Sequence, residues 1–308
     1  MTGDAPAIAI SEEQLAPVPG GLEICYQTFG DPSDPPILLV MGLGGPMLWW
    51  RTEFCLALAA LGFFVIRYDN RDTGRSSKVR ARVSRRAMVQ SFLGRGPRPP
   101  YTLDDMAGDG FGLLDHLGLT AAHVVGISMG GMIAQTMALL RPGRVLSLTS
   151  IMSTTGRRTV GWQDPRLLPL LLARSPQTRE AYVASSARFH KIIGSPGYPA
   201  TAQIVADRAA ETWARGVSSA GVGRQTLAIL NQPDRSRRLR ELTMPTLVIH
   251  GLADKMVHVS GGRATAHAVP GAELLLIPGM GHDVPEELYD PIAEAIARNA
   301  ARASRGHR

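Results

Sequence analysis

The chain has little cysteine and no long apolar run, and each shortage excludes a class of protein. Its 308 residues include two cysteines, Cys25 and Cys55. Two cysteines cannot form a disulfide framework, and since each lies in an apolar stretch, we expect buried free thiols in a reducing compartment. No uninterrupted apolar run reaches ~18 residues, so no transmembrane helix is predicted. The N-terminal stretch MTGDAPAIAISEEQLAP lacks a basic region followed by a long apolar core, so no signal peptide is predicted and we expect a cytoplasmic protein.

Lysine is also scarce, so the positive charge comes almost entirely from arginine. The formal net charge is +7, from 33 basic and 26 acidic residues. The densest basic runs, 80–98 and 235–241, are interpreted as solvated loop faces, because charge runs usually are. No aromatic residues are interleaved with them and no nucleic-acid-binding module is visible, so no nucleic acid partner is predicted. The positive charge leaves peripheral contact with an anionic surface open.

Strand-like and helix-like segments alternate along most of the chain. Strands are predicted at 22–31, 35–45, 63–72, 122–128, 144–153, 244–251 and 272–282, and helices at 53–62, 102–119 and 129–141. Most of these strands are continuous Val, Ile and Leu runs, which indicate strands buried on both faces. The pattern predicts an α/β fold with a mostly parallel central sheet covered by helices on both faces.

The alternation stops between residues 154 and 241. Several helical patterns follow one another there without a strand, among them a leucine-rich stretch at 166–176. We interpret 154–241 as an inserted helical cap that lies over the sheet edge, and residues 1–153 and 242–308 as the core.

One serine lies at the tip of a predicted strand, with a glycine two residues to either side of it. The segment VVGISMGG places Ser128 between a buried strand and an apolar helix. A G-x-S-x-G turn in this context is a nucleophile elbow, in which a strained backbone lifts the serine hydroxyl above the sheet. Gly126 and Gly130 remove side chains that would clash where strand and helix pass closely. The start of the following helix, with its unpaired N–H groups and positive dipole end, suits a developing oxyanion.

A serine hydroxyl becomes a good nucleophile only when a base takes its proton. Of the eight histidines, only His282 directly follows a buried strand, on the loop at its carboxyl end. Parallel strands bring all their carboxyl ends to one edge, so His282 and Ser128 are predicted to meet. His258 is the alternative base.

The base in turn needs a carboxylate that fixes its tautomer. Asp254 lies just beyond the strand at 244–251, again at the carboxyl edge, and is the predicted partner. Asp283 is a rival by sequence, although chain neighbours such as Asp283 and His282 rarely point at one another. Asp69 and Asp72 follow an earlier strand and are interpreted mainly as turn-holding residues that bond nearby backbone N–H groups.

These motifs together resemble a known family. The segments VMGLGG, VIRYDNRDTGRS, HVVGISMGGMIAQ, VIHGLADKMV and IPGMGHDVP occur in this order. They are similar to α/β-hydrolases of the serine esterase and lipase type, in particular the bacterial branch of aclacinomycin methylesterase-like enzymes. The resemblance spans nearly all of residues 20–300. It implies a catalytic triad of Ser128, Asp254 and His282, a helical cap over the pocket, and no cofactor.

The resemblance also implies an oxyanion hole made of two backbone N–H groups. One belongs to the residue after the nucleophile, Met129. The other belongs to the loop after the strand at 35–45, where the letters MGLG indicate Leu43. Many relatives carry His-Gly at the start of that loop, whereas this chain has Met41-Gly42. The glycine needed for the turn is retained, so we expect the backbone donor to be retained as well.

A serine nucleophile indicates acyl transfer rather than the chemistry of a carboxylate nucleophile. We therefore predict a hydrolase that cleaves a carboxylic ester of a hydrophobic small molecule through an acyl-enzyme. A thioesterase or a phospholipid acyl hydrolase on the same triad is the alternative. Met41, Trp50 and Trp213 are expected to line a broad apolar pocket for this substrate, although core packing explains such residues equally well.

A rival from another class is an NAD(P)-binding oxidoreductase. Gly42 and Gly44 follow a buried strand and match part of a dinucleotide-binding motif. The third glycine position is Met47, which would crowd the contact between helix and strand. The oxidoreductase therefore remains a distant alternative, and neither a cofactor nor a metal site is predicted.

Overall fold

A computed structural model of the chain describes residues 8–167, 169–170 and 176–305. The strands are β1 (Gln14–Val18), β2 (Leu22–Phe29), β3 (Pro36–Val40), β4 (Phe64–Tyr68), β5 (Ala122–Ile127), β6 (Val145–Ile151), β7 (Thr246–Gly251) and β8 (Glu273–Ile277). The helices are α1 (Thr52–Ala60), α2 (Arg85–Phe92), α3 (Leu103–His116), α4 (Met129–Leu140), α6 (Arg179–Ile193), α7 (Ala202–Gly216), α8 (Ser219–Leu230), α9 (Ser260–Ala268) and α10 (Tyr289–Arg305).

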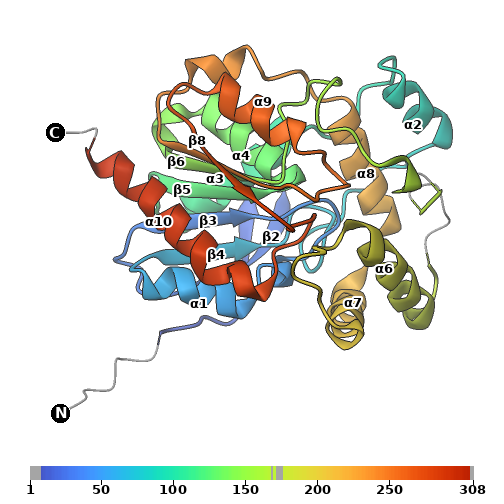
Figure 1. Cartoon of the computed structure of the whole chain (residues 1–308), viewed down its shortest axis with the longest axis horizontal. Coiled ribbons are helices and arrows are strands. Elements are labelled where there is room, and N and C mark those ends of the chain that lie inside the picture. Colours follow the sequence, from blue (N-terminus) through green and yellow to red (C-terminus); the bar gives the residue numbers. More distant parts are fainter. Residues whose placement is uncertain (1–7, 168, 171–175, 306–308) are drawn as a thin grey trace.

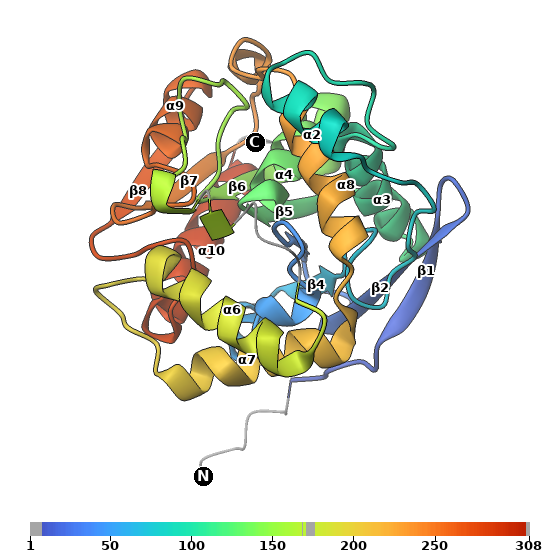
Figure 2. The ribbon, with the colours of Figure 1, turned by 90° about the vertical axis from the view of Figure 1, so that its right-hand side faces the viewer.

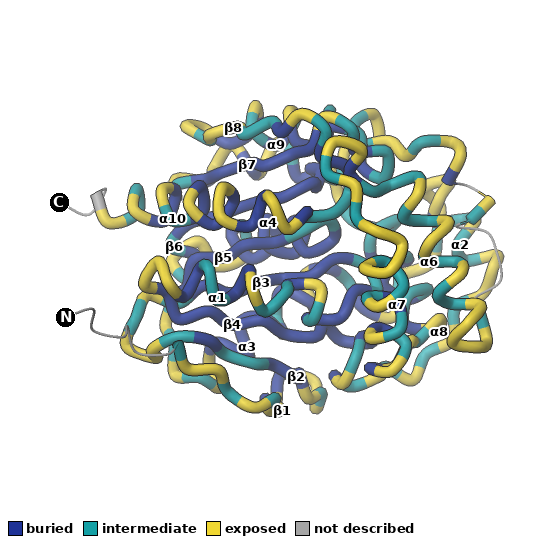
Figure 3. The backbone as a smooth tube through the Cα atoms, turned by 60° about the horizontal axis from the view of Figure 1, so that its bottom comes forward, coloured by how far each residue is buried: buried dark blue, intermediate teal, exposed yellow. Residues whose placement is uncertain are grey.

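The strands form one sheet in the order β1-β2-β4-β3-β5-β6-β7-β8. The pairs β1–β2 and β2–β4 are antiparallel, and every pair from β4 to β8 is parallel. Helices cover both faces, and the central strands between them are buried (Figures 1 and 3). The predicted α/β fold with a mostly parallel sheet is therefore confirmed.

Strand β3 shows how the sequence builds this core. Successive strand side chains point to opposite faces of a sheet. Leu38 and Val40 accordingly pack with residues of α3 and α4 on one face, and Ile37 and Leu39 with residues of α1 and α10 on the other. All four side chains are fully buried. A strand between two helical layers must therefore be apolar throughout, as this one is.

Two features of the fold differ from the sequence-based expectation. Strand β1 was not predicted; its residues alternate between exposed and buried from Leu15 to Val18, and the strand pairs with β2. The basic run 80–98 is not only a loop, because it contains α2. The side chain of Ser84 accepts a hydrogen bond from the backbone N–H of Ala87 and so caps the helix.

The predicted burial of free Cys25 and Cys55 is confirmed.

The described residues between 154 and 241 contain no strand, and α6, α7 and α8 lie there. The leucine-rich stretch 166–176 lies in part outside the described residues. Figure 2 looks onto α6, α7 and α8 with the sheet behind them. The division into a core and a cap stays a prediction.

Two buried ion pairs connect α7 and α8 to the loop after β4. Arg215 of α7 lies 2.8 Å from the carboxylate of Asp69, and Arg224 of α8 lies 2.7 Å from that of Asp72. Both carboxylates also accept hydrogen bonds from nearby backbone N–H groups, as predicted. Their ion pairs with residues far along the chain were not predicted.

None of the described helices is long and apolar enough to cross a membrane.

Candidate active site

Ser128 lies in the sharp turn between β5 and α4. Its backbone angles are φ 55° and ψ −118°, a left-handed conformation that is unusual for a residue with a side chain. A β-carbon on Gly126 would overlap the carbonyl group of Gly130, and one on Gly130 would overlap the carbonyl group of Val40. The glycines on either side of Ser128 are therefore required by the close passage of backbone.

The structure brings the three predicted triad residues into one hydrogen-bonded chain. The hydroxyl oxygen of Ser128 lies 3.0 Å from Nε2 of His282. The other ring nitrogen of His282, Nδ1, lies 2.8 Å from Oδ2 of Asp254. Ser128 follows β5, Asp254 follows β7 and His282 follows β8, so the carboxyl ends of three parallel strands supply the site.

Asp254 is held as a buried anion. Its Oδ1 atom accepts hydrogen bonds of 2.8 Å from the backbone N–H groups of both Met256 and Val257. Burial alone would raise the pKa of Asp254, but the nearby imidazoles of His282 and His250 lower it well below the usual carboxyl range. A carboxylate that stays ionised fixes the ring of His282 and stabilises its protonated form.

The rival candidates face elsewhere. Asp283 accepts a hydrogen bond from the hydroxyl of Ser195 and does not bond to its chain neighbour His282. His258 stacks on Trp162, with ring centroids 4.0 Å apart, and its Nδ1 lies 3.0 Å from the hydroxyl of Ser260.

The loop after β3 lies against the serine. A β-carbon on Gly42 would come within 3.2 Å of the β-carbon of Ser128. Within the described residues, no hydrogen-bond acceptor is found for the backbone N–H of Leu43 or of Met129, the first residue of α4. These two N–H groups are the predicted oxyanion donors, and the loop places one of them beside the elbow.

Three side chains hold this loop. Asn70 donates to the carbonyl of Met41 at 2.8 Å, and Asp69 accepts from the N–H of Met47 at 2.7 Å. Between them, Oε1 of Gln225 accepts from the N–H of Gly44 at 2.8 Å. Gln225 is fully buried and comes from α8. The loop that begins with Met41-Gly42 is thus anchored at both ends and in the middle.

The loop that carries His282 is held in a similar way by the last residue of α6 and by a residue that follows this helix. The N–H of His282 donates to the carbonyl of Ile193 at 2.7 Å, and the N–H of Gly281 donates to the hydroxyl of Ser195 at 2.8 Å. Gln225 and Ser195 were missed by sequence reasoning, because neither belongs to a motif.

The predicted pocket residues are distributed among different surroundings. Met41 and Trp50 are buried in the core layer beside α1, where Trp50 stacks on Phe54. Trp213 is half-buried and packs its ring against Tyr182 of α6, with centroids 5.6 Å apart. A role for these residues toward a substrate stays a prediction.

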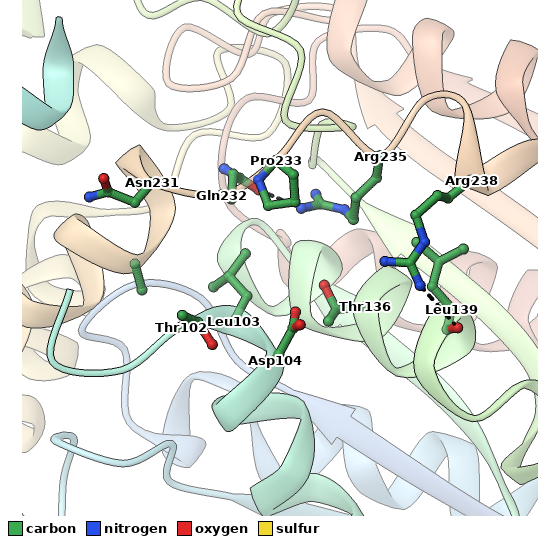
Figure 4. Close-up of a pocket in the computed structure, with 11 residues that line it drawn as sticks. Thr102, Leu103, Asp104, Thr136, Leu139, Asn231, Gln232, Pro233, Arg235 and Arg238 are labelled. Carbon is green, nitrogen blue, oxygen red and sulfur yellow. Dashed lines mark hydrogen bonds between the residues drawn. The ribbon is translucent and has the colours of Figure 1, made fainter. Parts of the chain in front are cut away.

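A separate pocket lies between the start of α3, α4 and the segment that follows α8 (Figure 4). Its lining includes Thr102, Asp104, Gln232 and Arg235, and none of the triad residues. Arg235 is buried and donates to side chains and a carbonyl around it, so it holds this segment in place. No cluster of side chains suited to a metal ion is found among the described residues.

An elbow serine, a histidine and a carboxylate at the carboxyl edge of a mostly parallel sheet define the class of α/β hydrolytic enzymes. The model of the alpha/beta hydrolase fold family matches residues 35–287, and the chain belongs to this family. The resemblance predicted from the motifs is confirmed.

Relatives and solved structures agree with this assignment. The chain is 33% identical to "Rhodomycin D methylesterase DauP" of Streptomyces sp. (strain C5), over 89% of this chain and 94% of that protein. It is 31% identical to "Putative carbamate hydrolase RutD" of Variovorax paradoxus, over 83% of this chain and 88% of that protein. The fold is similar to that of the enol-lactonase from Burkholderia xenovorans LB400, with a TM-score of 0.72, 22% identity, and coverage of 94% of this chain and 100% of that one. The prediction of an enzyme of the carboxylic ester hydrolase class is confirmed by the relatives' names.

Proposed function

We propose that the protein hydrolyses a carboxylic ester of a hydrophobic small molecule through an acyl-enzyme on Ser128. The hydrogen-bonded chain from Ser128 through His282 to Asp254 is the observation that carries the proposal. His282 takes the hydroxyl proton as the serine oxygen attacks the ester carbonyl, and then gives that proton to the departing alcohol. Water, deprotonated by His282, releases the acid and regenerates the serine.

The developing oxyanion would be bound by the backbone N–H groups of Leu43 and Met129. Donors that are already oriented stabilise the charge where it forms, and removing one donor typically costs about 10²–10³ in rate. The loop anchors described above support this role for Leu43, and the position at the start of α4 supports it for Met129.

The class of ester is proposed from the relatives. Two proteins 33% and 32% identical to this chain are named as rhodomycin D methylesterases, which favours a methyl ester as the substrate. We keep thioesters and phospholipid acyl esters as the alternative for the same triad. The proposed substrate is therefore an apolar ester, bound without a cofactor.

The test is a comparison of wild type with Ser128→Ala on a panel of methyl esters, short and long acyl esters and acyl thioesters. We expect turnover to fall at least ~10³-fold while the variant folds normally, because only binding and oxyanion effects remain. A serine-directed phosphonate is expected to label the wild type once, on the peptide that contains Ser128, and not to label the variant. Near-normal hydrolysis by the variant, or a label on another serine, would exclude the proposed triad.

A further inference from the structure

Helix α2 turns large apolar side chains toward solvent. Val89, Phe92 and Leu93 are 59%, 68% and 65% exposed. Their spacing of three and four residues places them on one face of the helix. A surface helix normally points such a face at the core. Burial of apolar side chains stabilises a fold, and this fold leaves that stabilisation unused at three neighbouring positions.

Polar contacts fix the opposite face of α2 against the protein. The hydroxyl of buried Ser91 accepts a hydrogen bond of 2.9 Å from the side chain of Asn231, the residue after α8. The guanidinium of Arg158 donates to the carbonyls of Phe92 and Ser91, at 2.6 and 3.0 Å. These bonds hold the helix in its orientation. The apolar face therefore points outward because the helix is fixed in that orientation, and not because the helix is frayed.

The segment of the chain that carries this face is basic and holds no acidic residue. No aspartate or glutamate occurs between residues 73 and 103. Six exposed arginines of this segment form no ion pair with any residue that the structure describes, and they are Arg80, Arg82, Arg85, Arg86, Arg95 and Arg98. We call the apolar face of α2 together with these six arginines the α2 surface.

We propose that the α2 surface docks on an anionic lipid bilayer. Apolar side chains on a short basic helix enter the boundary between headgroups and acyl chains, while arginines bind the lipid phosphates. A second copy of the chain fits this surface poorly, because a two-fold contact would bring two sets of unpaired arginines together. A nucleic acid would use the arginines but leave the apolar face unexplained.

The position of α2 gives this docking a geometric consequence. Helix α2 packs beside α8, at the same end of the molecule as α6 and α7 (Figures 1 and 2). Docking would therefore bring the end of the molecule that holds α6–α8 to the lipid surface. The inference is independent of the proposed reaction, since binding is measured without turnover.

The experiment is sedimentation of the full chain with vesicles of phosphatidylcholine, alone or with 30% phosphatidylglycerol, at low and high salt. One variant, Phe92→Ser/Leu93→Ser, removes the apolar contribution, and another, Arg85→Glu/Arg86→Glu, reverses two charges. The matched control, Arg237→Glu/Arg240→Glu, makes the same change in net charge at exposed arginines elsewhere. Thermal unfolding shows that each variant is folded, and analytical ultracentrifugation reports self-association.

We expect binding to the anionic vesicles that weakens with salt and is much weaker on phosphatidylcholine alone. Each arginine near an anionic surface contributes about fivefold to binding, so reversal of two is expected to weaken it at least ~25-fold. Loss of the two apolar side chains should weaken binding at least ~10-fold. This difference between wild type and variant should persist at high salt, because salt does not screen apolar contacts. The proposal is wrong if wild type does not bind anionic vesicles or if the control weakens binding as much as Arg85→Glu/Arg86→Glu. It is also wrong if the α2 variants abolish self-association and leave vesicle binding unchanged.

Discussion

Gln225 offers a sharp test of how α8 contributes to catalysis. Its side chain spans two loops, because Oε1 accepts from the N–H of Gly44 while Nε2 donates to the carbonyl of Arg71 and the hydroxyl of Thr73, at 2.8 and 2.9 Å. Gly44 directly follows Leu43, the proposed oxyanion donor. Gln225→Met keeps the size of the side chain and removes all three hydrogen bonds.

Two effects of Gln225→Met follow from these contacts. Unpaired buried polar groups cost about 1–3 kcal/mol each. Gly44 can bind a water instead, which leaves two such groups, so we expect a loss of about 2–6 kcal/mol in the free energy of unfolding. Complete loss of an oxyanion donor costs about 10²–10³ in kcat. Displacement of the loop weakens the Leu43 donor without removing it, so we expect kcat to fall roughly 10–100-fold. KM should change little, because apolar contacts bind the ground state.

The control is Arg224→Gln, one residue away on the same helix. This substitution breaks the buried pair with Asp72, 2.7 Å apart, and leaves the bond to Gly44 intact. Both variants should unfold at lower temperature than wild type, but only Gln225→Met should lose kcat on a short ester measured well below both transitions. The reasoning is refuted if Gln225→Met retains normal kcat, or if Arg224→Gln lowers kcat as far. A Ser128→Ala variant that stayed active would instead refute the proposed reaction.

Two further predictions concern buried carboxylates. Asp254→Asn should lower kcat by about 10⁴, as loss of the orienting acid does in other triads, whereas Asp283→Asn should have a far smaller effect; a reversed order in steady-state rates would contradict the assignment. Burial would raise the pKa of Asp72, but hydrogen bonds from Arg224 and Tyr101 lower it overall. The ionised carboxylate therefore stabilises the fold above the ordinary carboxyl pKa, and this stabilisation is lost as pH falls through the lowered pKa. The melting-temperature gap between wild type and Asp72→Asn should therefore narrow from about pH 5 to pH 3, and a constant gap would mean that the charge of Asp72 does not stabilise the fold. Asparagine tolerates the φ of 71° at this position, so the substitution removes the charge without straining the backbone.

The elbow and the order of the site loops could be predicted from the sequence because both depend on local rules. Continuous apolar runs indicate strands buried on two faces, and a serine between two glycines at the end of such a run indicates a turn that admits no side chains beside it. Asp254 and His282 follow strands of the same parallel set, so topology alone brings them to one edge. The structure places both within hydrogen-bond distance of one another.

The contacts that hold these loops were decided by the tertiary structure alone. Gln225 meets Gly44 across 181 residues of sequence, and Ser195 meets Gly281 across 86. No motif marks either residue, because a glutamine or serine on a helix or loop is ordinary until packing buries it against an unpaired backbone group. Asp69 and Asp72 show the same division. Their bonds to neighbouring N–H groups follow from local turn chemistry, whereas their ion pairs depend on how α7 and α8 lie over the sheet.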